Sequence, residues 1–342
     1  MADDLLKKLR VETLKPQHLT KLDSRVASTE LLGLQASLVG DWIAQLEQRF
    51  PDLLPSRSPR CLVALDDQQP VSAVIVRPYN RRGSCWSLDR PQPLNASSRF
   101  STASIERALL HQGLQLGSPH ICSWVARCPA ADGHAVSQLR ELGFQPLRPY
   151  QLWTPPKTAA TDAAKSSLGS ALHWEPINRR TARLLWPIEQ CGSFSHLRQI
   201  TDRHWLDLLD RGGPGCGVLM AGDSVLAGLV RTQSSPHQRF LELLRDVAWD
   251  DRLNAALPVV LHDVLQSARP DGLITSLDDP PLHAILEQQG WSQGEEQLLM
   301  GRNMWRRQST ARPIGLSRPI DGMLGRLRPP QTPVPTPSLG RR

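Results

Sequence analysis

The sequence predicts a mixed α/β protein of the α+β class, built from two similar units that each hold a mostly antiparallel sheet flanked by helices. Three observations predict it: one pattern occurs twice at the same internal spacing, the same succession of strands and helices follows in both halves, and a linker-like segment separates them. With 342 residues, 40% of them hydrophobic, the chain is long enough for two domains.

The repeat is centred on a glycine followed by an aromatic residue. In Gly143-Phe144 and in Gly290-Trp291, one leucine lies four residues before the glycine and another lies nine after it. A second pair of matching segments, AVIVR at 73–77 and AGLVR at 227–231, is separated by nearly the same offset. Two matched anchors with similar offsets indicate a duplicated unit.

The first half predicts its elements in the following order. Segment 28–50 begins with a Ser/Thr cap and keeps apolar residues at helical spacing, which indicates a helix. Two apolar runs at 61–78, joined by an Asp-Asp-Gln-Gln turn, predict a hairpin. The remaining segments are a strand at 84–91, a helix at 102–117, a strand at 120–128, a helix ending at Gly143 and a last strand.

The second half predicts the same succession. A helix at 201–212 precedes a hairpin at 217–232 that turns at Gly-Asp-Ser. The following segments are a strand at 239–249, a helix at 253–270, a strand at 272–279, a helix ending at Gly290 and a last strand. Each half is therefore expected to contain a hairpin, two further strands, two helices and a closing strand.

Composition sets the predicted boundaries. Segment 154–171 is rich in Ala, Ser and Thr and is expected to be a linker between a first domain at 1–153 and a second at 172–305. From Arg306 onward eight arginines accompany one acid, so this segment alone carries the net charge of +7. We expect 306–342 to be a disordered basic tail with nonspecific, salt-sensitive attraction to polyanions, and the neutral body to have no such attraction.

The element order, closing on L-x-x-x-G-[FW] and a last strand, resembles the GNAT N-acetyltransferase superfamily in both halves. The closing element of that family is similar to N-x-x-A-x-x-L-Y-x-x-x-G-F, and here Asp132 and Asp279 stand at the position of its Asn. The resemblance implies two tandem GNAT-like domains that use acetyl-CoA as the acyl donor.

The resemblance also implies a phosphate-binding loop, [QR]-x-x-G-x-[GA], at the start of a helix, where backbone N–H groups hold the diphosphate of the cofactor. The corresponding segment of the second half is degenerate. Its candidate cofactor-binding residues are Arg252, Leu253, Asn254, Ala255, Ala256 and Leu257. Arg252 fits either a phosphate contact or a solvated arginine at a helix start. The first half offers only TASIER at 102–107, which matches nothing in the loop.

Acyl transfer to an amine needs a route for deprotonating the amine and commonly an acid for the departing thiolate. Glu242 is the candidate base, because alternation places it on the strand face opposite Leu241 and Leu243. An ordinary strand-surface carboxylate is the alternative for this residue. The family often has a tyrosine as the acid four residues before the Gly-aromatic step, and here both positions are leucine, Leu139 and Leu286.

Two functions are consistent with these residues. One is acetyl-CoA-dependent transfer to a small-molecule or peptide amine, with the active site in the C-terminal half; the other is a catalytically silent pair of GNAT folds that binds or regulates. Six cysteines without a C-x-x-C pair, no signal peptide and no long apolar run predict a cytoplasmic protein without a metal site or a transmembrane segment.

Overall fold

The computed structural model describes residues 9–22, 31, 33–40, 43, 58–95, 98–116, 120–157, 168–232 and 239–304. The predicted tail at 306–342 and most of the predicted helix at 28–50 lie outside the described residues. In the first half the helices and strands are β1 (Leu9–Thr13), α2 (Pro16–Leu19), β2 (Arg60–Asp66), β3 (Gln69–Pro78), β4 (Cys85–Leu88), β5 (Gln92–Pro93), α4 (Thr102–Gln115), β6 (Ser123–Pro129), α5 (Gly133–Glu141) and β7 (Gln145–Thr154).

The second half repeats much of this order. Its elements are β8 (Leu172–Pro176), α6 (Arg179–Cys191), α7 (Ser195–Thr201), α8 (Trp205–Asp210), β9 (Gly217–Ala221), β10 (Ser224–Arg231), β11 (Phe240–Arg245), α9 (Arg252–Ser267), β12 (Gly272–Ser276), α10 (Pro280–Gln288) and β13 (Ser292–Asn303). The mixed α/β class, both hairpins and the strand-helix-strand-helix-strand order after them are confirmed. Strands β1, β5 and β8 and helices α2, α6 and α7 were not predicted.

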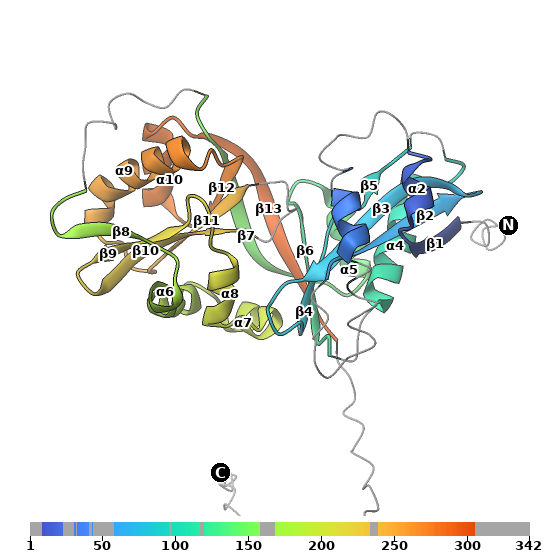
Figure 1. Cartoon of the computed structure of the whole chain (residues 1–342), viewed down its shortest axis with the longest axis horizontal. Helices are drawn as coiled ribbons and strands as arrows, with labels where there is room; N and C mark the ends of the chain where they lie inside the picture. The colour runs from blue at the N-terminus through green and yellow to red at the C-terminus, as the bar shows by residue number, and fades with distance from the viewer. Residues whose placement is uncertain are drawn as a thin grey trace, which may run out of the picture. The chain divides into compact units, whose positions relative to one another are not determined.

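Both halves contribute to one sheet, and their closing strands are exchanged. The strand order is β1-β2-β3-β4-β6-β13-β7-β12-β11-β10-β9-β8, with β5 beside β3 (Figure 1). Strand β13, from the end of the second half, pairs with β6 of the first half, whereas β7 of the first half pairs with β12 of the second. The two closing strands also pair with each other. Residues 1–304 therefore form one compact unit, in which the predicted linker joins two halves that share a sheet.

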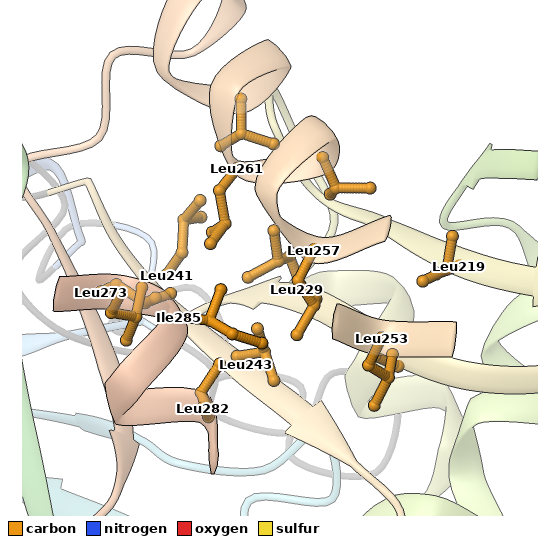
Figure 2. Close-up of a cluster of buried hydrophobic side chains, with 14 of the residues drawn as sticks. Leu219, Leu229, Leu241, Leu243, Leu253, Leu257, Leu261, Leu273, Leu282 and Ile285 are labelled. Carbon is orange, nitrogen blue, oxygen red and sulfur yellow. The ribbon is translucent and has the colours of Figure 1, made fainter. Parts of the chain in front are cut away.

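The exchange is visible in the hydrophobic cores. Trp153 of β7 is fully buried in the core beneath α9 and α10, which otherwise consists of residues of the second half. Met300 of β13 is likewise fully buried in the core beneath α4 and α5 of the first half. Figure 2 shows the core of the second half, where Leu253, Leu257 and Leu261 of α9 meet leucines of the sheet. Each core is thus completed by a side chain from the other half.

The Gly-aromatic repeat is a helix-ending device. Gly143 has φ of +84° and Gly290 has φ of +78°, a left-handed conformation that favours glycine. The N–H of Phe144 donates to the carbonyl of Leu139 and that of Trp291 to the carbonyl of Leu286, both at 3.0 Å. This is the Schellman pattern, in which the residue after the glycine also packs against the leucine five positions earlier. Both leucines and both aromatic residues are buried, so the repeat serves the core.

Candidate functional site

Both halves contain two neighbouring parallel strands that separate. Strands β11 and β12 pair only from Phe240–Glu242 against Gly272–Ile274, and β4 and β6 pair only from Cys85–Leu88 against Ser123–Ala126. After the last pair in the second half, β11 and β12 run on to Arg245 and Ser276 without pairing with each other. In the first half β4 ends at its last pair, and β6 runs on to Pro129. The backbone therefore opens a gap between β11 and β12 in the second half, and between β6 and the segment that follows β4 in the first.

A cavity of about 350 Å³, here called the gap cavity, lies where β11 and β12 separate. It is lined by the end of β11 and the residues after it, by the end of β12, and by the connection from α6 to α7. Phe194 and Val247 line it with unusually exposed side chains, 69% and 68% accessible. A concave site with exposed apolar side chains beside it is suited to a ligand that has an apolar portion.

A second cavity of about 260 Å³ is lined by residues of β4 and β6 and by residues of both closing strands. We call it the junction cavity. Four residues line both cavities: Tyr79, Arg203, Glu242 and Leu299. The gap cavity also reaches Arg148 and the junction cavity also reaches Arg127. The two cavities therefore meet around a common set of charged side chains.

We call this set the arginine cluster. It consists of four arginines (Arg127, Arg148, Arg203 and Arg211), two acids (Glu189 and Glu242) and two phenols (Tyr79 and Tyr150), the only tyrosines of the chain. Four cations and two carboxylates leave two positive charges in excess. The side chains of Glu189, Arg211 and Glu242 are at most 7% exposed, and that of Arg203 is 12% exposed.

Hydrogen bonds and ion pairs link successive side chains of the cluster. A guanidinium nitrogen of Arg203 donates to the hydroxyl of Tyr79, and another lies 2.7 Å from Glu189 Oε1. Arg211 lies 3.4 Å from the same Glu189 oxygen through Nη1 and bonds Glu242 Oε2 through Nη2. Arg211 Nε also donates to the carbonyl of Arg231 at 2.8 Å. Glu242 is therefore held in a buried ion pair.

The sheet register brings the remaining arginines to the same place. Leu299 of β13 lies opposite Arg127 of β6 on one side and opposite Arg148 of β7 on the other. Directly opposite residues of an antiparallel sheet project from the same face, so both arginines flank Leu299. Their guanidinium carbons lie 4.8 Å and 5.3 Å from the ring centroid of Tyr150.

The ionisation of the cluster follows from this charge balance. Burial raises the pKa of Glu242, but the positive charges of the four arginines outweigh burial and lower the pKa to about 2. Burial, together with the negative charge of Glu242, raises the pKa of Tyr150 to about 12. At neutral pH, Glu242 is therefore ionised and Tyr150 keeps its proton.

The predicted cofactor-binding residues lie elsewhere, in the first turns of α9. Leu253, Ala256 and Leu257 are buried in the core, as Figure 2 shows for the two leucines, whereas Arg252, Asn254 and Ala255 are exposed. No described residue from 252–257 lines the gap cavity. The structure thus brings Glu242 to the cavity and leaves the helix start outside its lining.

The start of α9 already holds an anion of its own chain. Asp250 accepts hydrogen bonds from the backbone N–H of Arg252 at 3.0 Å and from its guanidinium Nε and Nη2 at 2.9 and 2.7 Å. The guanidinium and backbone hydrogen bonds lower the pKa of Asp250 to about 2. A phosphate also accepts hydrogen bonds from these two kinds of donor, a backbone N–H and a guanidinium.

Both gaps are crossed by the same kind of ion pair. Arg245 at the end of β11 binds both carboxylate oxygens of Asp279, which also caps α10 by accepting from the N–H of Leu282. In the first half Arg90 lies 2.9 Å from Asp132, which caps α5 by accepting from the N–H of Ala135. The two aspartates at the family's Asn position are therefore helix caps tied to an arginine across the gap.

Sequence reasoning missed most of the arginine cluster. Its members are spread from Tyr79 to Glu242, and no short motif contains them. Two signals were present in the sequence: Arg148 and Tyr150 stand at i and i+2 of a predicted strand, and both tyrosines of the chain belong to the cluster. Neither signal identifies partners on other strands. Among the described residues, no group of three or more His, Cys, Asp and Glu side chains is placed to hold a metal ion.

Comparison with known proteins bears on the fold. No family model matches the chain, and no curated protein matches it. A structure solved as a candidate acetyltransferase from Pyrococcus horikoshii has a TM-score of 0.50 at 11% identity, covering 87% of this chain and 90% of that one. A GCN5-related N-acetyltransferase from Sphaerobacter thermophilus has a TM-score of 0.48 at 11% identity, with 86% and 96% covered. A tandem GNAT protein from the clavulanic acid biosynthesis pathway has 0.49 at 11% identity, with 86% and 98% covered.

The first of these likenesses bears on the fold class: the described part of the chain shares its mixed α/β fold with a structure solved as a candidate acetyltransferase. At this identity the likeness concerns fold alone. In the described ranges, no helix combines the length and apolar character needed to cross a bilayer.

Proposed function

We propose that the protein is an acyl-CoA-dependent N-acyltransferase built from two tandem GNAT-like units, and that the gap cavity of the second half holds the reacting groups. The observation that carries this proposal is the separation of β11 and β12 after Glu242, with a cavity of about 350 Å³ at that place. A slot beside separated parallel strands can admit an extended chain such as the pantetheine arm of acetyl-CoA, because both strand edges offer unpaired backbone groups there.

The residues present fit acetyl-CoA in two respects. The exposed side chains of Phe194 and Val247 offer an apolar lining to the arm, and Arg252 offers a backbone N–H and a guanidinium to a phosphate. Asp250 occupies these donors, but its side chain is 32% exposed, so it can turn into solvent when a phosphate replaces it. When bound, the cofactor supplies an acyl group activated as a thioester.

The ionisation states assign roles within the cavity. Glu242, the candidate base, is ion-paired and has a pKa of about 2, which makes it a weak proton acceptor near pH 7. We therefore assign to it the role of holding Arg211, and assign deprotonation of the amine to solvent. Tyr150 lines the cavity with a protonated hydroxyl and is our candidate proton donor to the departing thiolate, in place of the tyrosine that Leu286 replaces.

A catalytically silent binding protein is the second candidate function. It is favoured by the bidentate pair between Arg245 and Asp279 across the gap, and by Asp250, whose negative charge opposes a diphosphate at the start of α9. Polyanion contact through the tail stays a prediction, since the tail lies outside the described residues. A cytoplasmic location also stays a prediction.

Calorimetric titration of the full chain with acetyl-CoA tests the proposal. We expect saturable binding, and about tenfold tighter binding by Asp250→Asn, because the substitution removes a like charge from the phosphate contact. Asp223→Asn, on the exposed turn between β9 and β10, is the matched control and should bind like the wild type. Absence of binding by both the wild type and Asp250→Asn contradicts an acyl-CoA site.

Release of CoA thiol in the presence of primary amines then separates the two candidates. Thiol release that depends on the amine, and that falls at least tenfold in Tyr150→Phe, supports the transferase. Binding of acetyl-CoA without thiol release from any amine in a broad panel supports the silent binding protein.

A further inference from the structure

Within the arginine cluster, the two carboxylates do not balance the four positive charges. Four guanidinium groups face two carboxylates in a region where most of the side chains are shielded from water. Unpaired charge in a shielded region costs free energy, and proteins usually satisfy it with a partner or a ligand. The two cavities that meet at the cluster leave room for such a ligand.

Hydrogen-bonding groups of the cluster without partners also indicate a ligand. Among the described residues, Arg127 Nη1 and Arg203 Nε are buried donors without a hydrogen-bond partner, and Glu189 Oε2 is a buried acceptor without one. Buried polar atoms of folded proteins are nearly always hydrogen-bonded, so each unpartnered one calls for an explanation. Arginine donors suit the planar or tetrahedral oxygens of a carboxylate or a phosphate, and Glu189 Oε2 suits an N–H of the same ligand.

The gap cavity also has acidic side chains in its lining. Asp246 and Asp278 line it, both are exposed, and neither forms an ion pair within the described residues. Asp246 lies four residues after Glu242 along β11 and its continuation, which is roughly 13 Å of extended chain. The cavity therefore offers acids to a cationic group in addition to arginines for an anionic one.

We propose that the acceptor amine carries an anionic group, a carboxylate or a phosphate, and that the arginine cluster binds this group. The inference rests on the proposed function only for the fate of the amine, because recognition of the anion needs no acyl donor. Arg127 and Arg148 come from β6 and β7 of the first half, so substrate recognition depends on the exchange of closing strands.

Matched pairs of probes test the proposal on the full chain without any acyl-CoA. Triglycine is compared with triglycinamide, and glucosamine 6-phosphate with glucosamine, by the shift of the thermal unfolding midpoint at constant ionic strength. We expect at least one anionic probe to stabilise the protein saturably and at least tenfold more tightly than its neutral partner. The pair that discriminates identifies a carboxylate or a phosphate as the recognised group.

The variants locate the binding. Arg127→Gln should weaken the effective anionic probe at least tenfold, Arg127→Lys should weaken it less, and Arg140→Gln, which removes an exposed arginine of α5, should leave it unchanged. Arg148→Gln gives the same test if Arg127→Gln does not fold. Equal effects of charged and neutral probes, or equal affinity of the wild type and both cluster variants, overturn the proposal. Either result is independent of whether acetyl-CoA binds.

Discussion

At the scale of the residue, Glu242 shows how far sequence reasoning reaches. Alternation placed it on the face opposite Leu241 and Leu243, and the structure has both leucines in the core and Glu242 facing the cluster. What alternation could not supply was its partner. Arg211 follows α8 in a glycine-rich stretch that reads as a loop, 31 residues away along the chain. The ion pair with Arg211 helps to lower the pKa of Glu242, so this carboxylate holds Arg211 in place and is a weak base.

The ion pair makes a prediction for stability. Glu242→Gln should lower the free energy of unfolding by about 3 kcal/mol, because it leaves the buried Arg211 without its countercharge. Glu141→Gln is the matched control, since the pair of Glu141 with Arg107 is mostly exposed and should contribute less than about 1 kcal/mol. Urea unfolding at pH 7 measures both. Equal losses in the two variants would show that the cluster does not need Glu242.

The pH dependence of the same pair has a definite sign. The pKa of Glu242 falls from 4.5 to about 2 on folding, so its contribution is complete above about pH 4.5 and is lost as the pH falls toward 2. The difference in unfolding free energy between the wild type and Glu242→Gln should therefore narrow as the pH falls from about 4.5 toward 2, the window set by these two values. A difference that stays constant over this range contradicts the ionised pair.

At the scale of the element, the closing helices were predictable and their surroundings were not. A glycine after a leucine-bearing helix, followed by an aromatic residue, is a local signal for a Schellman end, and both copies form it. The capping role of Asp132 and Asp279 is equally local. Of the arginines that bind these caps, Arg245 is the last residue of β11 and Arg90 follows the end of β4, and only the folded sheet brings them to their aspartates.

The two cross-gap pairs should differ in strength. Side chains of Arg245 and Asp279 are 13% and 6% exposed, whereas those of Arg90 and Asp132 are 56% and 24% exposed. A double-mutant cycle with Arg245→Gln and Asp279→Asn should give a coupling energy of about 1 to 2 kcal/mol, and the cycle at Arg90 and Asp132 less than about 1. Asparagine keeps the helix cap, so the cycle isolates the ion pair. Equal coupling in both halves would mean that burial does not strengthen the pair.

At the scale of the whole molecule, the exchange of β7 and β13 makes the halves depend on each other. A fragment of residues 172–304 lacks Trp153, which is fully buried in the core of the second half, and leaves β12 and β13 without β7. We expect this fragment to show no cooperative thermal unfolding by circular dichroism. A longer fragment, 144–304, keeps β7 and should unfold cooperatively.

The full chain with Trp153→Ala completes that comparison. Loss of a buried tryptophan from a close-packed core should lower the free energy of unfolding by about 3 to 5 kcal/mol. A cooperative transition of 172–304 equal to that of 144–304 would show that the second half folds without the exchanged strand.

The sequence by itself determined the elements and their duplication: the hairpins, the helix ends, the strand that carries Glu242 and the two copies of one order. These follow from turn residues, caps and periodicity, which act over a few neighbouring positions. Tertiary structure alone decided that the closing strands are exchanged and that arginines from β6, from β7 and from the segments after α7 and α8 surround Glu242. Strand pairing and buried charge depend on residues far apart in the chain, and no local pattern records which of them meet.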